Sequence, residues 1–297
     1  MVLSTPPAFR ASVEERLRRE AMSARRPVNR VRTLLVMERF VARLVAVAPQ
    51  TFLLKGGFAL ELRLERARTT RDVDLRAMGA SGSLPAILAR AATLRPAPED
   101  HLVFRVEPNR EHPEVGAAWM EYDGLRFTVT STLAGRLFGD PFGLDIAYAD
   151  PIRGEPEILE GSDFFGRYGI PPLRVPVYPV ASHLAEKLHA YTMPRPHPSS
   201  RAKDLVDIAL LSTVSGHDAA EIREAIHQTF AFRRTHPPPE ALPDPPGSWE
   251  PMVARAQAED GLPWATVDDV HADARQLLDP VLAGVEGRWD AQTRTWR

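Results

Sequence analysis

Residues 53 to 76 read LLKGGFALELRLERARTTRDVDLR, and this stretch decides the fold. Its apolar start leads into a pair of glycines, which is typical of a short buried strand that ends in a tight turn. The run FALELRLER then has helical spacing, whereas RDVDLRAM alternates between polar and apolar residues, which predicts a second strand. We therefore expect a strand, a glycine turn, a helix and another strand in this order.

Helical and strand patterns continue on both sides of this stretch. Helical spacing predicts helices over residues 11–26, 28–48 and 83–95. Two runs further along, LRFTVTSTL and FGLDIAYAD, predict two more strands.

The pattern changes near residue 176, where the proline-rich run PPLRVPVYP is followed by helical segments only. We therefore predict a bilobed chain of the α/β (α+β) class. Residues 1–175 form a mixed sheet with flanking helices, and residues 176–297 form a helical lobe.

Composition excludes several classes of site and of protein. The chain has no cysteine, so disulfides and thiolate zinc sites are excluded, and any metal must be held by oxygen or imidazole ligands. No apolar run approaches the roughly 18 residues of a membrane span, and the N-terminus lacks the pattern of a signal peptide. We expect a soluble, cytoplasmic protein with no membrane partner.

Arginine is concentrated at the N-terminus, although the net charge of the whole chain is only −2. Residues 1 to 43 contain ten arginines and four glutamates, which gives this segment a charge of +6. Arginines of this kind could bind the phosphates of a nucleic acid. Alternatively, they are charges on solvated helix faces, and composition alone does not separate these interpretations.

Two aspartates stand one residue apart in the strand RDVDLR. Alternation makes the side chains of Asp72 and Asp74 point the same way, with their α-carbons about 6 to 7 Å apart. Their repulsion, on the order of a few kcal/mol, would be removed by a divalent cation, and oxygen ligands suit Mg²⁺ or Mn²⁺. Asp145 lies in the apolar run GLDIAY and, on a neighbouring strand, could supply a third ligand. A single aspartate here could equally be a turn or capping residue.

The glycine pair, Gly56 and Gly57, precedes a helix. Backbone N–H groups at such a turn can bind an anion such as a phosphate. A tight turn without any ligand is the commoner explanation of two glycines. The pair indicates a phosphate site only in combination with the two aspartates that follow on the next strand.

Four separated motifs resemble a known family. The segments LLKGGFALELR with RTTRDVDLR, LDIAYAD, AEKLHAYTM and RAKDLVDIALL are similar to the AbiEii-type nucleotidyltransferases, which include the MenT toxins of mycobacterial toxin–antitoxin pairs. The resemblance covers about residues 50 to 210. It implies a two-lobed nucleotidyltransferase with a site like that of DNA polymerase β.

The resemblance also implies roles for individual residues. Magnesium or manganese would be held by Asp72, Asp74 and Asp145. The bound nucleoside triphosphate would be contacted by Lys55, Gly56, Gly57, Thr70, Lys187 and Asp207. Thr70 falls where such toxins carry a Ser or Thr that can be phosphorylated, and Phe58 departs from the small hydroxyl residue that usually follows the glycines.

The helical lobe contributes charged residues of its own. Asp204 and Asp207 are three residues apart and share one helical face. Solvated salt bridges would explain them, but with the upstream motifs Lys187 is expected to bind triphosphate, while Asp204 accepts a proton or orients Lys187. We also expect phosphate contacts from Arg201 and Lys203, and a packing role for His189.

The function implied is that of a toxin that transfers nucleotides from a nucleoside triphosphate to the 3′ end of tRNA and so blocks translation. A basic surface made by the N-terminal arginines, Arg201, Arg233 and Arg234 would bind the RNA. A cognate antitoxin is the second expected partner. Two alternatives remain open: transfer to a protein or a small molecule, and a non-catalytic module that binds nucleotide or RNA.

Overall fold

The computed structural model describes residues 5–64, 67–79, 84–109, 124–194 and 201–297. By their internal contacts they fall into two compact units. The first unit comprises residues 1–63, 70–149 and 158–177, and the second comprises residues 64–69, 150–157 and 178–297. The two short segments 64–69 and 150–157 thus belong with the C-terminal helices, which the lobes predicted from sequence did not anticipate.

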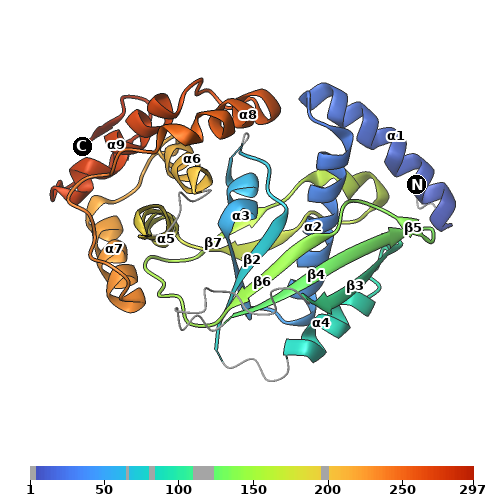
Figure 1. The fold of residues 1–297 in the computed structure, drawn as a ribbon. Helices are drawn as coiled ribbons and strands as arrows, with labels where there is room; N and C mark the ends of the chain where they lie inside the picture. The colour runs from blue at the N-terminus through green and yellow to red at the C-terminus, as the bar shows by residue number, and fades with distance from the viewer. Residues whose placement is uncertain (1–4, 65–66, 80–83, 110–123, 195–200) are drawn as a thin grey trace. The chain divides into compact units, whose positions relative to one another are not determined.

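The first unit is built on a mixed eight-stranded sheet (Figure 1). Seven strands lie in the order β3-β4-β6-β2-β1-β8-β7, and β5 pairs with β4. Their bounds are β1 Phe52–Lys55, β2 Asp72–Ala77, β3 Leu102–Pro108, β4 Gly124–Leu133, β5 Arg136–Leu137, β6 Phe142–Ala147, β7 Glu157–Glu160 and β8 Arg174–Val177.

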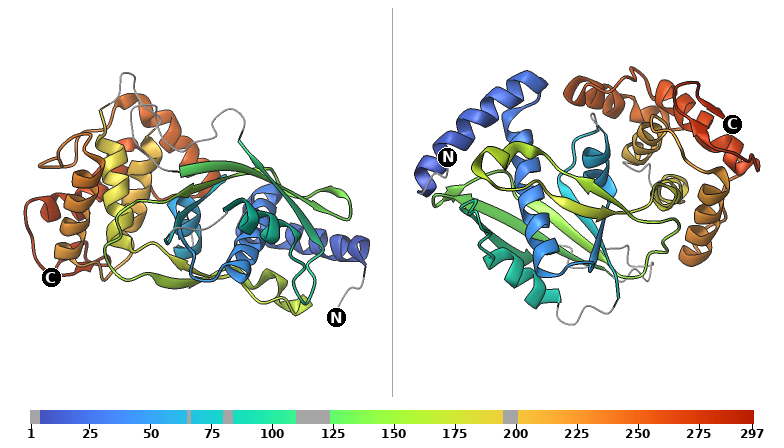
Figure 2. Two further views of the ribbon diagram at one scale, coloured as in Figure 1. Left: turned by 90° about the horizontal axis from the view of Figure 1, so that it is seen from below. Right: turned by 180° about the vertical axis from the view of Figure 1, so that it is seen from behind.

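The helices of this unit are α1 Pro6–Ala24, α2 Val28–Val47, α3 Gly56–Arg63, α4 Leu84–Thr93 and the short 3₁₀ helix η1 Asp163–Tyr168. Helix α2 lies across one face of the sheet, as the right panel of Figure 2 shows. The predicted mixed sheet with flanking helices is confirmed.

The core of the first unit lies between this face of the sheet and the helices. Along β2, Val73, Leu75 and Ala77 are buried in that core, and Asp72 and Asp74 occupy the alternate positions. Strand β6 repeats the pattern, since Leu144 and Ile146 are buried and Asp145 lies between them. The acidic side chains therefore belong to the face of the sheet opposite α2.

The second unit is mainly helical. Its elements are α5 Val180–Thr192, α6 Ala202–Leu211, α7 Ala219–Arg233, the 3₁₀ helix η2 Gly247–Trp249, α8 Glu250–Asp260, α9 Val267–Leu282 and the hairpin strands β9 Trp289–Asp290 and β10 Thr295–Trp296. Helix α5 packs against α6 and α7, and α6 packs against α9. The sequence patterns did not predict α8 or the small hairpin. None of the helices in the described ranges combines the length and apolar character that a bilayer crossing requires.

Candidate active site

The strand β2 places the two adjacent aspartates within a row of charged residues that crosses the sheet. Asp74 is paired in register with Lys55 of β1 on one side and with Asp145 of β6 on the other. Asp145 is in turn paired with Arg126 of β4. Residues opposite each other on neighbouring strands point to the same face. The prediction that Asp145 lies on a strand next to the aspartate pair is therefore confirmed.

Each aspartate of β2 lies against a glycine. Gly56 has a φ of +67°, and a Cβ added to it would lie 1.9 Å from Oδ2 of Asp74. A Cβ on Gly143 of β6 would lie 2.3 Å from Oδ1 of Asp72. Gly56 is thus required both by the close approach of the Asp74 side chain and by its left-handed backbone, whereas at Gly143 only a carboxylate oxygen of Asp72 lies in the way.

Arg126 is a member of the site that the sequence analysis missed. Its Nε and Nη2 donate hydrogen bonds of 2.7 and 2.6 Å to the two carboxylate oxygens of Asp145. The hydrogen bonds to Asp145 raise the pKa of Arg126, burial opposes them, and the charges of Asp145, Asp72 and Asp74 raise it further. Arg126 therefore partly neutralises the acidic row, which consists of Asp72, Asp74 and Asp145. The signal that could have identified Arg126 is its position as a charged residue in the run LRFTVTSTL, which was predicted to be a strand.

The donor set is compatible with a hard divalent cation. Asp72 and Asp74 lie on one face and Asp145 is beside Asp74, so oxygen ligands of the kind that Mg²⁺ prefers come from two adjacent strands. Within the described ranges, however, no three His, Asp or Glu side chains already form a group that could hold a metal ion. Asp145 would have to exchange its bidentate contact with Arg126 for the ion.

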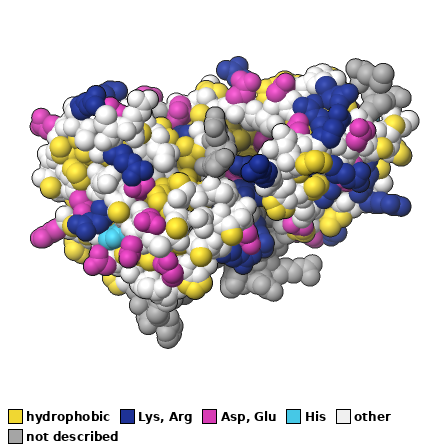
Figure 3. Space-filling model, turned by 90° about the horizontal axis from the view of Figure 1, so that it is seen from above, with side chains coloured by type: hydrophobic (Ala, Val, Ile, Leu, Met, Phe, Trp, Pro, Cys, Tyr) yellow, Lys and Arg dark blue, Asp and Glu magenta, His cyan; other side chains and the backbone are white. Residues whose placement is uncertain are grey.

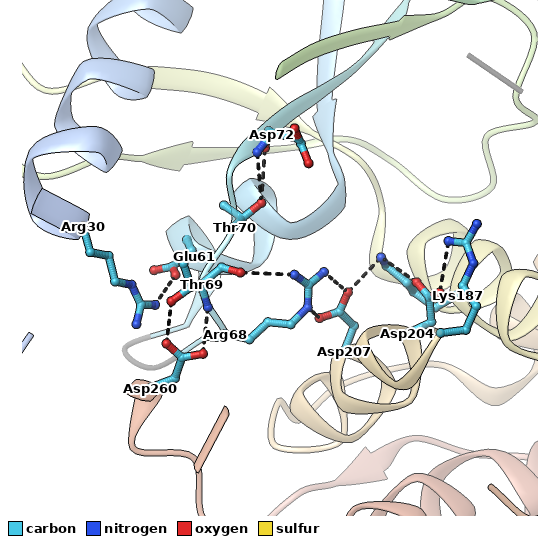
Figure 4. Close-up of polar contacts among 11 residues, drawn as sticks. Arg30, Glu61, Arg68, Thr69, Thr70, Asp72, Lys187, Asp204, Asp207 and Asp260 are labelled. Atoms are coloured by element: carbon cyan, nitrogen blue, oxygen red, sulfur yellow. Dashed lines mark hydrogen bonds and ion pairs between the residues drawn. The ribbon is translucent and has the colours of Figure 1, made fainter. Parts of the chain in front are cut away.

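Other predicted residues of the first unit lie near the start of β2 and at the end of β1. The Thr70 hydroxyl donates a 3.3 Å hydrogen bond to the carbonyl oxygen of Asp72, and the Thr70 side chain is largely buried (Figure 4). Lys55 is also buried, at the end of β1 directly before Gly56. Phe58, which replaces the expected small hydroxyl residue, is fully buried in the core.

In the second unit, Lys187 of α5 lies between two carboxylates of α6. Its Nζ is 2.8 Å from Oδ2 of Asp207 and 3.2 Å from Oδ1 of Asp204 (Figure 4). Burial alone would lower the pKa of Lys187, but the charges of Asp207 and Asp204 outweigh it and raise that pKa. Both aspartates are almost completely buried, so these are not the solvated salt bridges of the simpler interpretation.

Arg68 completes this network and was also missed. Its Nε and Nη2 donate hydrogen bonds of 2.7 and 2.8 Å to the carboxylate of Asp207. Burial would raise the pKa of Asp207, but Arg68 and Lys187 together lower it, so the carboxylate stays ionised. The neighbouring Thr69 donates two hydrogen bonds to Asp260 of α8, from its N–H at 2.9 Å and its hydroxyl at 2.6 Å.

Further residues of the second unit are partly engaged elsewhere. Arg201 contacts Asp204 at 3.3 Å, and Lys203 is exposed. Arg233 is an ion-pair partner of Asp150, at 3.1 Å, so its guanidinium is not part of an open basic surface. His189 is buried, and its pKa is lowered to about 3 by burial and then by the charge of Arg233, which fits the packing role expected of it.

Most arginines of the N-terminal segment are used inside the first unit. Arg39 and Arg43 are buried against Asp100, at 3.0 and 2.5 Å. Six others form ion pairs or hydrogen bonds with carboxylates: Arg10, Arg16, Arg19, Arg26, Arg30 and Arg32. On the face drawn in Figure 3, basic and acidic side chains are interspersed. The charge of +6 therefore overstates the basic surface of this segment.

Comparisons with known proteins identify a family and similar folds. The family described as nucleotidyl transferase AbiEii toxin, type IV toxin–antitoxin system, matches residues 39–285. Among solved structures, MenT4, a nucleotidyltransferase toxin of Mycobacterium tuberculosis H37Rv, is 15% identical with a TM-score of 0.57, over 95% of this chain and 92% of that one. JHP933 of Helicobacter pylori is 14% identical with a TM-score of 0.48, over 87% and 95% of the two chains. No curated protein matches the sequence.

Proposed function

The chain belongs to the AbiEii family of nucleotidyltransferase toxins, and from this premise we propose that it transfers a nucleotide from a nucleoside triphosphate to the 3′ end of tRNA. The observation that carries the proposal is the register of β2 and β6, which pairs Asp74 with Asp145 and leaves Asp72 on the same face. Three carboxylates at this spacing are costly unless a cation compensates them.

Asp72, Asp74 and Asp145 are the residues that would hold Mg²⁺ or Mn²⁺. The ion would neutralise negative charge that develops on the triphosphate during transfer. Arg126 holds the carboxylate of Asp145 in place when no ion is bound, and it keeps the acidic row partly neutral.

The triphosphate is assigned to groups of the first unit. In the first unit, the N–H groups of Gly56 and Gly57 at the start of α3 are donors for phosphate oxygens, with Lys55 and Thr70 beside them. For Lys187 of the second unit, phosphate binding stays a prediction that rests on the family resemblance. Asp207 holds Lys187 and Arg68 in position rather than contacting the nucleotide, because both of its oxygens are engaged by these cations.

The reaction replaces the phosphoanhydride link between the α- and β-phosphates by a phosphoester link to the acceptor. The acceptor hydroxyl oxygen bonds to the α-phosphorus, the bond from that phosphorus to the bridging oxygen of the pyrophosphate breaks, and pyrophosphate leaves. The hydroxyl proton goes to Asp145. Positioning and charge neutralisation supply most of the rate enhancement.

The choice of RNA as acceptor rests on an open groove in the first unit. Arg10 and Arg18 of α1 and Arg136 of β5 line it. Arg18 forms no ion pair with any described residue, and Arg136 is exposed, so both are available to phosphates. If this groove binds tRNA, Arg18→Gln with Arg136→Gln will raise KM for tRNA and reduce its salt dependence by about one unit of slope per lost phosphate contact.

A suitable control for that variant is Arg105→Gln, because Arg105 is equally exposed but is paired with Glu107 on the edge strand β3. It should leave KM unchanged. An unchanged KM in the groove variant would remove the groove from the proposal.

The transfer itself is tested with each of the four nucleoside triphosphates, labelled at the α-phosphate and incubated with total RNA, protein or small metabolites. We expect label in tRNA, loss of labelling in Asp72→Asn, and normal labelling in Glu107→Gln, which removes an exposed charge from the same sheet. Label in protein or metabolites instead would establish the alternative acceptor. Full toxicity of Asp72→Asn in cells would favour a non-catalytic binding module.

Membership of the family also implies a cognate antitoxin. Thr70 is the residue at which the resemblance allows control by phosphorylation. Its hydroxyl contacts the backbone of Asp72, so a phosphate there would place negative charge beside the acidic row.

A further inference from the structure

The first unit contains a pocket of about 450 Å³ that the proposed reaction does not use. Its walls come from the end of α1, from α2 and α3, and from the turn between β7 and η1. The apolar part of the lining consists of Val31, Leu34, Leu35, Phe58 and Leu62. The volume lies within the usual range for small-molecule sites, which is roughly 300 to 1,000 Å³.

A buried carboxyl group, Glu38 of α2, lines this pocket. Its side chain is only 8% exposed. One oxygen accepts a 2.9 Å hydrogen bond from the N–H of Ser162, and Glu38 forms no ion pair with any residue in the described ranges. The adjacent Arg39 is directed instead to Asp100 and to the carbonyl oxygen of Pro171. A carboxyl group that is buried without a cationic partner is rare in protein interiors.

The other charged groups around the pocket compensate one another. Glu61 of α3 is paired with Arg30 at 2.5 Å and with Arg26 at 3.6 Å. Glu20 of α1 is paired with Arg16 at 2.8 Å. Glu160, the last residue of β7, is exposed at the rim and has no ion pair in the described part of the chain. Because Glu61 has two arginine partners, their surplus positive charge offsets Glu160, and Glu38 is the acid that is left without a compensating cation.

We propose that this pocket binds a small organic cation, an amidine, guanidine or amine with an apolar body, whose charged group pairs with Glu38. The apolar walls would cover the body of the ligand, and N–H donors on a planar cation match the two oxygens of a carboxylate. An anion is disfavoured beside the carboxyl group of Glu38. The ligand completes a charge pair that the chain lacks, which explains why Glu38 is placed in the pocket wall.

A simpler explanation is that Glu38 only accepts the hydrogen bond from Ser162. A glutamine would serve that purpose without the cost of a buried acid. Burial raises the pKa of Glu38 to about 8, so near neutral pH the empty pocket holds a protonated carboxyl group. The charge of Glu61 raises this pKa and that of Arg39 lowers it, each less than burial does. Pairing with a cation would release the proton.

The test compares charged ligands with neutral ligands of the same shape. Titration calorimetry on the full chain uses benzamidine and hexylamine, with benzamide and hexanol as neutral counterparts. We expect the cations to bind about tenfold or more tightly than their counterparts, and Glu38→Gln to lose about tenfold or more in affinity for the cations. Glu15→Gln is the matched control, because Glu15 is an exposed glutamate of α1 outside the pocket.

Proton release provides a second readout that a structural role would not produce. At pH 7, repeating the titration in buffers of different ionisation enthalpy should show nearly one proton released per benzamidine bound to the wild type and none in Glu38→Gln. The affinity of the wild type should rise up to about tenfold per pH unit between pH 6 and 8.

Three results would overturn the proposal. They are equal binding of charged and neutral ligands, equal binding by the wild type and Glu38→Gln, and no binding of either cation at millimolar concentration. Leu34→Trp, one helical turn before Glu38, fills part of the pocket and should abolish binding. Circular dichroism and thermal unfolding show whether each variant is folded, so loss of the fold is not mistaken for loss of the ligand.

Discussion

Arg126 holds both carboxylate oxygens of Asp145, with hydrogen bonds of 2.7 and 2.6 Å. This contact places a cation of the chain where a metal ion would need a ligand. The two cations compete for one carboxylate, and the competition makes the role of Asp145 measurable.

Replacing Arg126 by glutamine should strengthen metal binding. Because Asp145 is then free, we expect the Mg²⁺ concentration at half-maximal transfer to fall about threefold to tenfold, the scale of a charge-assisted hydrogen bond. A Mg²⁺ titration of the labelled-nucleotide reaction measures it. Arg105→Gln on the neighbouring strand should leave the midpoint unchanged. An unchanged or higher midpoint in Arg126→Gln would mean that Asp145 is only a structural partner.

Gly56→Ala should damage both stability and transfer. The left-handed backbone at φ +67° costs about 1 to 2 kcal/mol for alanine, and the new methyl group would collide with Asp74. Gly135→Ala is the matched control, since Gly135 has a φ of +73° with nothing within 4 Å of the added Cβ. Urea unfolding should show a larger loss for Gly56→Ala, and only that variant should lose transfer. Equal losses in stability would exclude the collision with Asp74.

Lys187→Met should destabilise the second unit strongly. It leaves two buried carboxylates without their shared cation, a change that typically costs about 3 to 5 kcal/mol. Lys203→Met, an exposed lysine on α6, should have almost no effect on unfolding in urea. A small loss in Lys187→Met would show that Arg68 and Arg201 are sufficient to hold the two acids.

The same network makes a prediction about acid. The folded pKa of Asp207 lies below the ordinary value of 3.8, so its contribution is complete above that pH and is lost as the pH falls further. Unfolding free energies of the wild type and Asp207→Asn should therefore begin to approach each other below about pH 4 and continue to do so as the pH falls. A difference that stays constant as the pH falls below 4 would assign the network a role independent of charge.

Glu38 should give the opposite pH dependence. Its folded pKa of about 8 lies above the ordinary value of 4.5, so the folded state keeps a proton that the unfolded state loses. The stability of the wild type should fall as pH rises from 4.5 to 8, by up to about 1.4 kcal/mol per unit. Glu38→Gln should remove this slope and be the more stable protein at pH 8, whereas Glu15→Gln should keep the slope. Parallel curves for the wild type and Glu38→Gln would contradict the assignment.

Local sequence patterns predicted those features of the site that are set within a single strand. Alternation in RDVDLR placed Asp72 and Asp74 on one face, and the apolar neighbours of Asp145 identified a second strand. Arg126 was not predicted, although it lies in a recognised strand, because the register between β4 and β6 depends on a turn and on packing that no short motif encodes.

Charge patterns were the less reliable guide. The N-terminal arginines suggested a surface for RNA, but Arg39 and Arg43 point into the first unit because Asp100, more than fifty residues later, meets them there. The pocket around Glu38 was also invisible in the sequence, since its walls come from four segments between residues 20 and 162. Both features depend on contacts between distant segments.

The side chains of Asp72 and Asp74 each lie directly against a glycine, Gly143 and Gly56 respectively. In natural variants of this chain, Asp72 and Gly143 should therefore change together. A lineage that loses Asp72 can acquire a side chain at position 143, whereas position 56 stays restricted by its left-handed backbone even after Asp74 is lost. A side chain at position 143 would thus mark lineages in which the carboxylate of Asp72 is no longer needed.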